Sequence, residues 1–413
     1  MQISKKLKYL RQAIWFHVEK NNLKRIPMIL GIDASNLRQG GGLTHIIELI
    51  SNLEPKKHNF HKIIIWGSKT TLNGLNNPPW LFKFSPKELE KGFISRFFWQ
   101  KFKLPELALA SKCDLLFIPG GSFSCKFRPI VTMSRNMLPF EWAEVRRYGF
   151  TPITLRLIIL RWLQSKSFRS ANGVIFLTNY AQNQVIKIIG RISGKKIIIP
   201  HGLNQRFKME PKKQFKISEY SLENPYQLLY VSIIDQYKHQ LNVLDAVSKL
   251  RDQGYPVILN LVGPSYSPAL KLLSKKIQKI DQRKEFINYH DSIPYEDLHN
   301  IYKMSHLGIF ASSCENMPNI LIEKMAAGLP IACSNKGPMP EVLGGAGLYF
   351  NPESPDEIFE ALKHFISDPG LREVKAKASY KLVQKYSWST CTKDTFDFLH
   401  IIKDEHKEYL CAE

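Results

Sequence analysis

The sequence lacks several patterns that would assign it to a familiar class of protein. Its six cysteines include no C-x-x-C pair, so neither a disulfide framework nor a zinc site is indicated, and a reducing cytosol is the simplest setting. No run approaches the roughly 18 apolar residues that a membrane-spanning helix needs. Residues 1–20 alternate charged with apolar residues, so we expect no signal peptide. Internal repeats and low-complexity tracts are also absent.

Acidic residues are scarce in the first half of the chain. Residues 1–200 contain 32 Lys and Arg against 10 Asp and Glu, whereas residues 201–413 contain 26 of each, so the net charge of +22 comes entirely from the first half. A basic half beside a neutral half indicates contact with something anionic, such as a phospholipid surface, a lipid-linked phosphate or a nucleic acid. The sequence carries no RNA-recognition, zinc-finger or helix-turn-helix signature, which disfavours a nucleic-acid-binding protein.

Two basic segments of the first half are candidates for membrane contact. Residues 1–27 carry apolar residues at helical spacing among Lys and Arg, namely Ile3, Leu7, Leu10, Ile14 and Val18. Residues 91–107, "KGFISRFFWQKFKLPEL", combine five aromatic residues with four basic ones. Both patterns are typical of helices lying on an anionic membrane surface, and both are equally compatible with helices packed on the body of the protein.

From Pro27 onward, compact apolar runs alternate with longer helical patterns. This alternation is typical of α/β domains whose parallel sheets are covered by helices on both faces. A polar, proline-containing stretch separates two such series and predicts an inter-domain linker. The sequence thus predicts two Rossmann-like domains facing each other across a cleft, with ligand sites at the carboxyl ends of the strands. The predicted strands are 28–33, 61–66, 114–120, 129–134, 173–178 and 196–200, then 227–232, 257–263, 286–290, 307–312, 330–334 and 347–350.

The predicted domain boundaries follow from this division. Residues 28–203 form the N-terminal domain, residues 204–226 the linker, and residues 227–387 the C-terminal domain, with a last helical segment at 388–413.

Three glycines, Gly40 to Gly42, follow the first predicted strand and precede a helix. Backbone N–H groups at such a turn can approach a phosphate closely, although a tight strand-to-helix turn needs glycine in any case. His45 lies in the first turn of that helix, where a single histidine is more often structural than catalytic. In the second domain, Lys238 follows a strand and a short polar loop. It is either a ligand for a diphosphate or a solvated loop lysine.

The stretch "SSCENMPNILIEKMAAGLP", residues 312–330, contains the strongest local signal. A helix follows a buried strand, with Pro318 expected in its first turn and Gly328 after its end. Its N-terminus should point into the cleft, where free N–H groups near Asn316, Met317 and Asn319 attract anionic oxygens.

Two glutamates belong to this stretch. Glu315 precedes the helix and can reach a ligand lying across its N-terminus. Glu323 lies in an apolar run, so its carboxylate needs a hydrogen-bonded partner, and the vicinal hydroxyls of a ribose match its two oxygens. A simple preference of glutamate for the positive end of the helix dipole, worth at most about 1 kcal/mol, explains either residue but not the pair.

The segment "ENMPNILIEKMAAGLPIACSNKGPMPEVLGGAGLYFNP" closely resembles the donor-binding segment of glycosyltransferase family 4, a retaining family with the GT-B fold. Further similarities are found in "GGGLTH", "NMLPFE", "KKIIIPHGLNQRF" and the "YVS" segment that precedes Lys238. Together they extend from about residue 28 to residue 400. In this fold the last helix, at 388–413, crosses back to the N-terminal domain.

The resemblance implies roles for named residues. Glu323 would hold the ribose of a UDP- or GDP-linked sugar, Glu315 would bind hydroxyls of the donor sugar, and Lys238 would bind the diphosphate. The implied donor-binding set also contains Asn316, Met317, Pro318, Asn319, Ile320, Gly41, Gly42 and Ser232.

Two departures from the family pattern concern the leaving group. The usual Gly-Arg after the strand is Ser232-Ile233 here, which removes one basic phosphate ligand. The segment "TMSRNMLPF" has Arg135 and Asn136 where many members have a catalytic-cleft histidine, so both are candidate catalytic residues together with Glu315 and Lys238. Arg135 is the candidate to supply the missing charge.

The resemblance further implies a metal-independent transfer, which agrees with the absence of a D-x-D motif, and it implies no cofactor. The expected acceptor is a saccharide, lipid-linked, of a bacterial surface polysaccharide or lipopolysaccharide. The expected location is the cytoplasmic face of the inner membrane, on an anionic surface and without nucleic acid as partner. A nucleotide-sugar 2-epimerase of the same fold and a basic nucleic-acid-binding protein are the alternatives.

Overall fold

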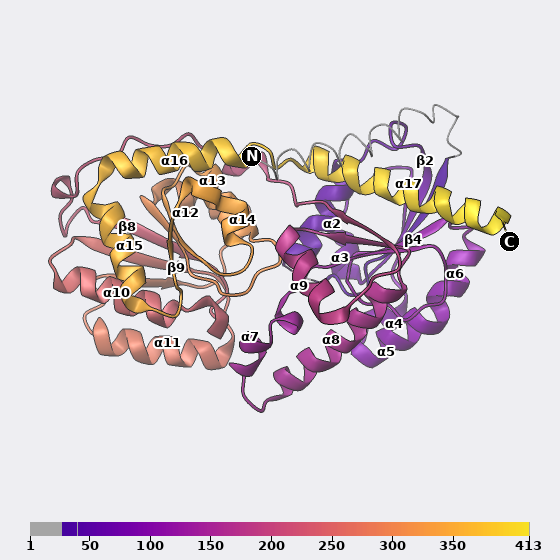
Figure 1. Cartoon of the computed structure of the whole chain (residues 1–413), viewed down its shortest axis with the longest axis horizontal. Helices are drawn as coiled ribbons and strands as arrows, with labels where there is room; N and C mark the ends of the chain where they lie inside the picture. The colour runs from indigo at the N-terminus through magenta and orange to yellow at the C-terminus, as the bar shows by residue number, and fades with distance from the viewer. Residues whose placement is uncertain (1–26, 39, 413) are drawn as a thin grey trace.

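The structure is a computed structural model that describes residues 27–38 and 40–412. The basic amphipathic segment predicted at residues 1–27 therefore lies, except for Pro27, outside the described residues. Two parallel sheets, one in each half of the chain, form two domains side by side (Figure 1). This arrangement confirms the predicted fold class.

The first sheet has seven strands in the order β3-β2-β1-β4-β5-β6-β7, and every pair is parallel. Strands β4, β5 and β6 are buried at every position, as expected of apolar runs covered on both faces. The strands are β1 (Met28–Asp33), β2 (Phe60–Trp66), β3 (Leu81–Phe84), β4 (Leu115–Ile118), β5 (Ile130–Met133), β6 (Gly173–Phe176) and β7 (Lys195–Ile198).

Strand β3 is absent from the sequence predictions. It lies at the edge of the sheet, and its Phe82 and Phe84 side chains are 44% and 49% exposed. A half-exposed run of four residues does not carry the apolar pattern by which the other strands were predicted.

Helices cover both faces of this sheet. They are α2 (Gly41–Ser51), α3 (Lys69–Asn73), α4 (Lys87–Glu90), α5 (Phe93–Phe98), the π-helix η1 (Trp99–Lys103), α6 (Leu104–Ala110), the 3₁₀ turn η2 (Leu138–Phe140), α7 (Trp142–Arg146), α8 (Pro152–Ser170) and α9 (Asn179–Ile189).

The second sheet has six parallel strands in the order β10-β9-β8-β11-β12-β13. The strands are β8 (Tyr226–Val231), β9 (Val257–Val262), β10 (Ile287–His290), β11 (Leu307–Phe310), β12 (Ile331–Ser334) and β13 (Leu348–Phe350). The helices and turns are η3 (Gln205–Phe207), η4 (Ile217–Glu219), η5 (Gln236–Lys238), α10 (Gln240–Asp252), α11 (Ser267–Ile280), α12 (Leu298–Met304), α13 (Asn319–Ala326), α14 (Met339–Leu343), η6 (Gly344–Ala346), α15 (Pro355–Ser367), α16 (Pro369–Val383) and α17 (Trp388–Ala412).

Each sheet has one point at which the strand order reverses. The reversal lies between β1 and β4 in the first sheet and between β8 and β11 in the second. Ligands of open parallel sheets bind at the carboxyl ends of the strands at such points. The loops that follow these four strands contain Gly40–Gly42, Lys238 and Glu315, so the topology brings the predicted site residues to these edges.

The chain crosses between the domains twice, and the two crossings touch. The first crossing follows β7, and the second leads into α17, drawn in yellow along the first domain in Figure 1. A Cβ atom on Gly202 would lie 2.2 Å from the backbone nitrogen of Trp388. Further along α17, the rings of Phe396 and Phe60 meet with their centroids 5.1 Å apart, which anchors the helix to the first sheet.

We expect Gly202→Ala to destabilise the protein by about 2–4 kcal/mol, because the added methyl group meets backbone rather than a movable side chain. The measurement is urea-induced unfolding followed by tryptophan fluorescence. Gly345→Ala is the matched control, since nothing lies within 4 Å of a Cβ at that position. Equal unfolding midpoints for the two variants would contradict the importance of the contact.

Candidate active site

The N-termini of two helices from different domains face each other. Helix α2 begins at Gly41 after β1, and α13 begins at Asn319 after β11. A Cβ atom on Gly41 would lie 3.7 Å from the amide nitrogen of the Asn319 side chain. Gly40 has a φ of 66°, which favours glycine at the residue before α2. Both helix ends carry partial positive charge, so the place where they meet favours an anionic group.

Lys238 and Glu315 form an ion pair at the carboxyl edge of the second sheet. The Lys238 Nζ atom bonds to Glu315 Oε1, and both side chains are largely buried. The ammonium group also lies 4.8 Å from the ring centroid of Tyr237. Burial lowers the pKa of Lys238, but the attraction of Glu315 outweighs it and leaves this pKa above its ordinary value. The lysine is therefore positively charged at neutral pH and lies beside the segment that precedes α13.

Glu323 is buried in α13, and its carboxylate accepts hydrogen bonds from two tyrosines. The hydroxyl of Tyr302 donates to Glu323 Oε2 at 3.0 Å, and that of Tyr295 donates to Oε1 at 3.3 Å. Burial raises the pKa of Glu323 to about 7, although both hydrogen bonds oppose this shift. Each carboxylate oxygen can accept a second hydrogen bond, so the tyrosines orient the group and leave acceptor capacity for a ligand.

The residues before α13 differ in part from the prediction. Pro318 is the N-cap residue rather than a residue of the first turn, and the N–H of Asn319 is not free, because it donates to the Met317 carbonyl at 3.0 Å. The N–H groups of Asn316 and Met317 have no acceptor within the described part of the chain. Ile320 is half-buried in the first turn.

Asn316 and Met317 also join the two domains. The carbonyl of Asn316 accepts a hydrogen bond from Thr178 Oγ1 at 2.9 Å, and its side-chain amide donates to Ser134 Oγ at 3.1 Å. The sulfur of Met317 accepts the N–H of His201 at 3.0 Å. The segment in front of α13 is therefore held from the first domain.

Arg135 lies behind the glycine turn. Its guanidinium donates to the carbonyls of Gly41, at 2.5 Å, and Gly42, at 3.3 Å. Burial lowers the pKa of Arg135 to about 10, so the side chain is still charged at neutral pH. Asn136 does not join it, since its side chain is exposed and accepts the N–H of Leu138 at 3.0 Å.

Ser232 is engaged within its own domain. Its hydroxyl donates to the carbonyl of Ile233 at 3.1 Å and accepts from Gln240 Nε2 at 2.9 Å. The structure thus brings Gly41, Arg135 and Asn319 together where the ends of α2 and α13 meet, while Lys238 and Glu315 pair in the loops after β8 and β11.

Two buried histidines are a part of the site that sequence reasoning underestimated. The rings of His45 and His201 lie 4.7 Å apart and both contact the indole of Trp388. Burial lowers the pKa of His201 to about 3 and that of His45 well below its ordinary value, so both are neutral. His201 Nδ1 lies 3.0 Å from the Asn319 side-chain oxygen, which orients the amide nitrogen toward Gly41. The sequence segment "PHG", which contains His201, was the signal from which a role for this histidine could have been predicted.

Three further contacts between the domains were not predicted. Glu341, on α14, accepts hydrogen bonds from the N–H groups of Asn179 and Tyr180 at the start of α9, at 2.8 and 2.9 Å. Arg147 bonds to Glu353, and the Tyr148 hydroxyl donates to Asp235 at 2.9 Å. These contacts hold the two domains together. No local sequence pattern signals them, because each depends on how the domains are placed.

No group of three or more His, Cys, Asp or Glu side chains in the described ranges could hold one metal ion. No helix between residues 27 and 412 is long and apolar enough to cross a membrane.

Comparisons with known proteins agree with this geometry. Residues 212–382 match the family model of glycosyl transferases group 1. Over 239 residues the chain is 24% identical to the O-antigen chain mannosyltransferase B of Escherichia coli, covering 56% of this chain and 61% of that protein. Over 206 residues it is 27% identical to the lipopolysaccharide 1,2-N-acetylglucosaminetransferase of Salmonella typhimurium, covering 46% and 52%. The matches thus span little more than half the length of either relative.

A solved structure matches over nearly the whole chain. Anabaena HepE in complex with UDP superposes with a TM-score of 0.64 at 17% identity, covering 90% of this chain and 99% of that one. The structural match shows the GT-B fold, and residues 212–382 are similar to glycosyl transferases group 1.

The buried carboxyl of Glu323 predicts a pH-dependent stability. Because its pKa is about 7 when folded and near 4.5 when unfolded, the folded protein binds the extra proton. The resulting stabilisation is complete below pH 4.5 and is lost as pH rises through 7. Relative to Glu323→Gln, the wild type should therefore lose up to about 3 kcal/mol of unfolding free energy between pH 5 and 8. Urea unfolding at both pH values measures this, and parallel pH profiles would contradict it.

Proposed function

We propose that this protein is a retaining glycosyltransferase that moves a sugar from a UDP- or GDP-linked donor to a hydroxyl group of a saccharide acceptor. The observation that carries the proposal is the close approach of the N-termini of α2 and α13, together with the Lys238–Glu315 pair in the loops after β8 and β11. Two helix ends and a buried lysine offer a diphosphate three sources of positive charge. The group 1 family match over residues 212–382 supports the same assignment.

The donor is placed by matching its groups to the site. The ribose hydroxyls would donate to Glu323, whose oxygens already accept the two tyrosine hydroxyls. The diphosphate would lie between the helix ends, near the N–H groups of Asn316 and Met317. Glu315 would bind hydroxyls of the sugar. Lys238 is paired with Glu315 in the unbound protein. When the diphosphate binds, the Lys238 ammonium would contact both the Glu315 carboxylate and a phosphate oxygen.

The same groups suit the chemical step. The bond from the anomeric carbon to the diphosphate breaks through an oxocarbenium-like state, the bond to the acceptor oxygen forms on the same face, and the proton of the acceptor hydroxyl passes to the departing phosphate oxygen. Negative charge then grows on the departing diphosphate, where Lys238 and the α13 N-terminus stabilise it. Arg135 adds a charge behind the glycine turn and compensates for the absence of the family's arginine at Ile233. In this proposal neither a metal nor a cofactor is required.

The acceptor is proposed from the relatives and the charge distribution. O-antigen and lipopolysaccharide sugar transferases are among the similar proteins, and the first half of the chain is strongly basic. A lipid-linked saccharide of a surface polysaccharide or lipopolysaccharide fits both facts. The protein would then act in the cytoplasm, peripherally on the anionic inner face of the membrane. The comparisons favour neither a 2-epimerase nor a nucleic-acid-binding protein.

Thermal-shift screening against UDP, GDP and their sugars tests the proposal. A ligand that binds the folded state stabilises it with the logarithm of its excess over the dissociation constant. We expect a dose-dependent rise in Tm with one of the two nucleotide families. No shift with any of them would contradict the proposal. Consumption of the donor without any acceptor would indicate the epimerase instead.

The two glutamates should separate binding of the nucleotide from transfer of the sugar. Glu323→Ala removes both acceptors for the ribose, so the Kd for the bare nucleoside diphosphate should rise about tenfold or more. Glu315→Ala should leave that Kd within about threefold while lowering sugar transfer by about a hundredfold. Isothermal titration and a transfer assay measure the two quantities. Equal effects of both substitutions would contradict the division of roles.

Arg135→Ala tests the charge behind the glycine turn. We expect kcat to fall about tenfold or more, because charge develops on the diphosphate only during the reaction. Arg283→Ala is the matched control, since that side chain is 87% exposed and far along the chain from the site residues. Unchanged turnover in Arg135→Ala would contradict the role.

A further inference from the structure

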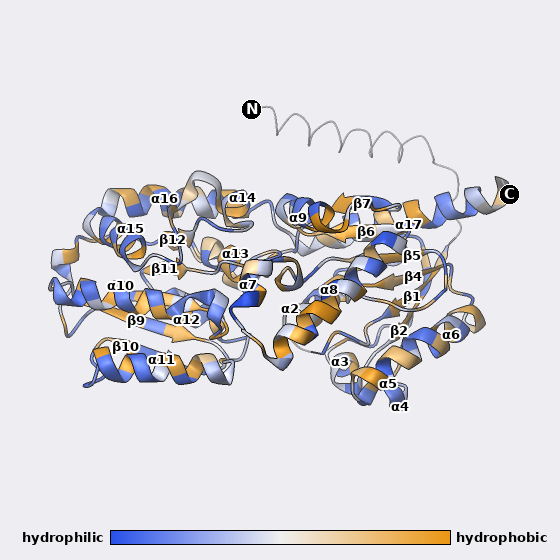
Figure 2. Cartoon of the chain, turned by 60° about the horizontal axis from the view of Figure 1, so that its bottom comes forward, coloured by the Kyte–Doolittle hydropathy of each residue, from blue (hydrophilic) through white to orange (hydrophobic). Residues whose placement is uncertain are grey.

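A second lysine is buried near the Lys238–Glu315 pair. Lys324 belongs to α13, and its side chain is completely buried. It points at the second sheet, whose apolar strands β11 and β12 are drawn largely in orange in Figure 2. Its stem lies over Gly308 of β11, where a Cβ atom would be 3.1 Å from Lys324 Cδ. The glycine leaves the space that the lysine stem occupies.

The ammonium group of Lys324 ends close to that of Lys238. Helical side chains lean toward the N-terminus of their helix, so a long side chain on α13 carries its charge back toward Asn319. The Lys324 Nζ atom donates to the carbonyl of Ile309 at 2.5 Å, near the carboxyl end of β11. It lies 5.3 Å from the centroid of the Phe310 ring, and Lys238 Nζ lies 5.8 Å from the same centroid. The two cations thus share one aromatic ring at the ligand-binding edge of the sheet.

Tyr230 makes a second connection between these lysines. Its ring centroid lies 5.2 Å from Lys324 Nζ, and its hydroxyl donates to the backbone carbonyl of Lys238 at 2.6 Å. Tyr230 and Phe310 come from β8 and β11, the adjacent strands between which the strand order reverses. Aromatic faces attract cations, so both rings hold the Lys324 charge at this point without neutralising it.

No carboxylate compensates the charge of Lys324 by direct contact. Within residues 27–38 and 40–412 it forms no ion pair, and its hydrogen bond goes to a neutral carbonyl. Burial lowers the pKa of Lys324 to about 7. The ionised forms of Cys333, Glu323 and Glu315 raise this pKa, and the Lys238 charge lowers it. Cys333 is a neutral thiol at this pH, because burial raises its own pKa.

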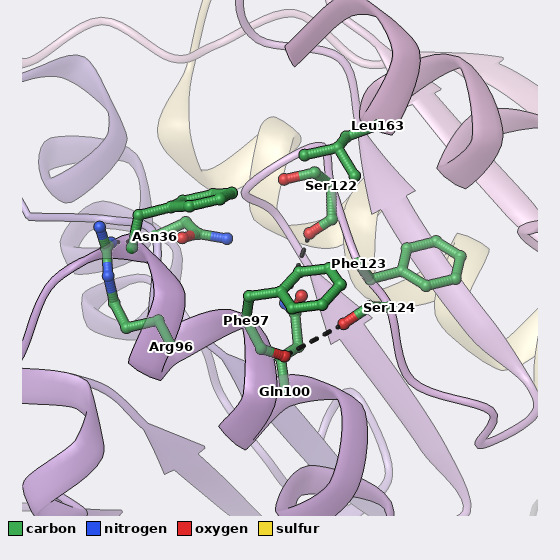
Figure 3. Close-up of a pocket in the computed structure, with 9 residues that line it drawn as sticks. Asn36, Arg96, Phe97, Gln100, Ser122, Phe123, Ser124 and Leu163 are labelled. Carbon is green, nitrogen blue, oxygen red and sulfur yellow. Dashed lines mark hydrogen bonds between the residues drawn. The ribbon is translucent and has the colours of Figure 1, made fainter. Parts of the chain in front are cut away.

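Arg96 of the first domain shows a more usual arrangement for a partly buried cation. Its guanidinium donates to the carbonyl of Ser35 at 3.2 Å and to Asn36 Oδ1 at 3.3 Å, beside the small pocket drawn in Figure 3. Burial lowers the pKa of Arg96, and the Asp33 carboxylate opposes that shift. Arg96 thus has a counter-charge within its own domain. The counter-charge that suits Lys324 is instead an anion at the edge of the sheet.

We propose that Lys324 is a further cation of the diphosphate site, which acts on the ligand from inside α13 without touching it. This inference rests on the proposed function, in which the diphosphate lies next to Lys238. A diphosphate there attracts the Lys324 charge across the Phe310 ring, in an interior that screens charge less than water does. The same attraction favours the protonated amine, so the lysine takes up a proton from solvent when the ligand binds.

Lys324→Met tests the charge, because methionine keeps an unbranched apolar stem and removes the ammonium group. By isothermal titration, the Kd of UDP or GDP, whichever the wild type binds, should rise about tenfold. The Kd of the corresponding nucleoside monophosphate should rise less than threefold. Lys275→Met, at an exposed lysine of α11, removes the same charge from the surface of the same domain and should change neither value. An unchanged diphosphate Kd in Lys324→Met would overturn the inference.

Urea unfolding of the same variant distinguishes this role from a purely structural one. A lysine that served only the fold would destabilise the protein when replaced. We expect the unfolding midpoint of Lys324→Met to equal or exceed that of the wild type, because an apolar side chain removes an uncompensated charge from the interior. A lowered midpoint with an unchanged diphosphate Kd would assign Lys324 to folding alone.

Proton uptake gives a third measurement. Titrations at pH 7.5 in HEPES and in Tris, which differ in ionisation enthalpy, count the protons taken up with the nucleoside diphosphate, whose terminal phosphate is already ionised. Glu323 titrates in the same range, and ribose hydroxyls favour its charged form, so the count is made in Glu323→Gln. Uptake should occur there and disappear in Glu323→Gln/Lys324→Met. Equal proton counts in both would overturn the inference.

Nucleotide binding by the wild type separates this inference from the proposed function. Binding of UDP or GDP that Lys324→Met leaves unchanged would overturn the role of Lys324 alone. Absence of binding of both nucleotides to the wild type would overturn the glycosyltransferase and the role of Lys324 together.

Discussion

The contact between Gly202 and Trp388 determines how the rest of the molecule is arranged. Here the two crossings of the chain between the domains touch backbone to backbone, with room for no side chain on the glycine. The indole of Trp388 also covers His45 and His201, one on α2 and the other in the crossing itself. A single contact therefore links the helix that bears the glycine turn, the connection between domains and the returning helix. The approach of the α2 and α13 ends to each other depends on this helix, on the connection between the domains and on the returning helix.

Charge inside the site is placed before any ligand arrives. Lys238 is held by Glu315, and Glu323 by two tyrosines, so neither group is buried without a partner. An unpaired buried charge would cost several kcal/mol, and a flexible one would have to be ordered during the reaction. In this protein the folded chain meets these costs in advance, and under the proposed function the site is preorganised for a diphosphate.

The strands and the main site residues could be predicted because their signals are local. A strand buried on both faces appears as an apolar run, and the two glutamates flank a proline-containing helix start in one short segment. Edge strand β3 lacks this signal, since Phe82 and Phe84 are half exposed. Tyr295 and Tyr302 could not be assigned to Glu323 either, because one lies in the loop after β10 and the other on α12, and both reach α13 only in the folded domain.

Prediction was weakest where two domains meet. The sequence indicated a charge at Arg135, but only the structure shows it bonded to the glycine turn. The pairing of His201 with Asn319 likewise joins residues 118 positions apart. Contacts of this kind follow from the relative placement of two separately folded sheets, which leaves no periodicity in the sequence. The exposed apolar residues of α8, namely Leu155, Ile158, Ile159 and Trp162, have a regular spacing, but their outward direction becomes evident only once the other face of the helix is seen to be buried.

The carboxylate of Glu341, which lies at the start of α9, affects where an anion can bind. Helix N-termini of parallel α/β domains all present free N–H groups, so a phosphate group has little basis for binding one rather than another. At α9 the protein seats its own carboxylate, supplied by the opposite domain, on the N–H groups of Asn179 and Tyr180. These N–H groups are thereby occupied, and an anion could bind them only by displacing the carboxylate. A single side chain thus links the two domains and satisfies the N-terminus of α9.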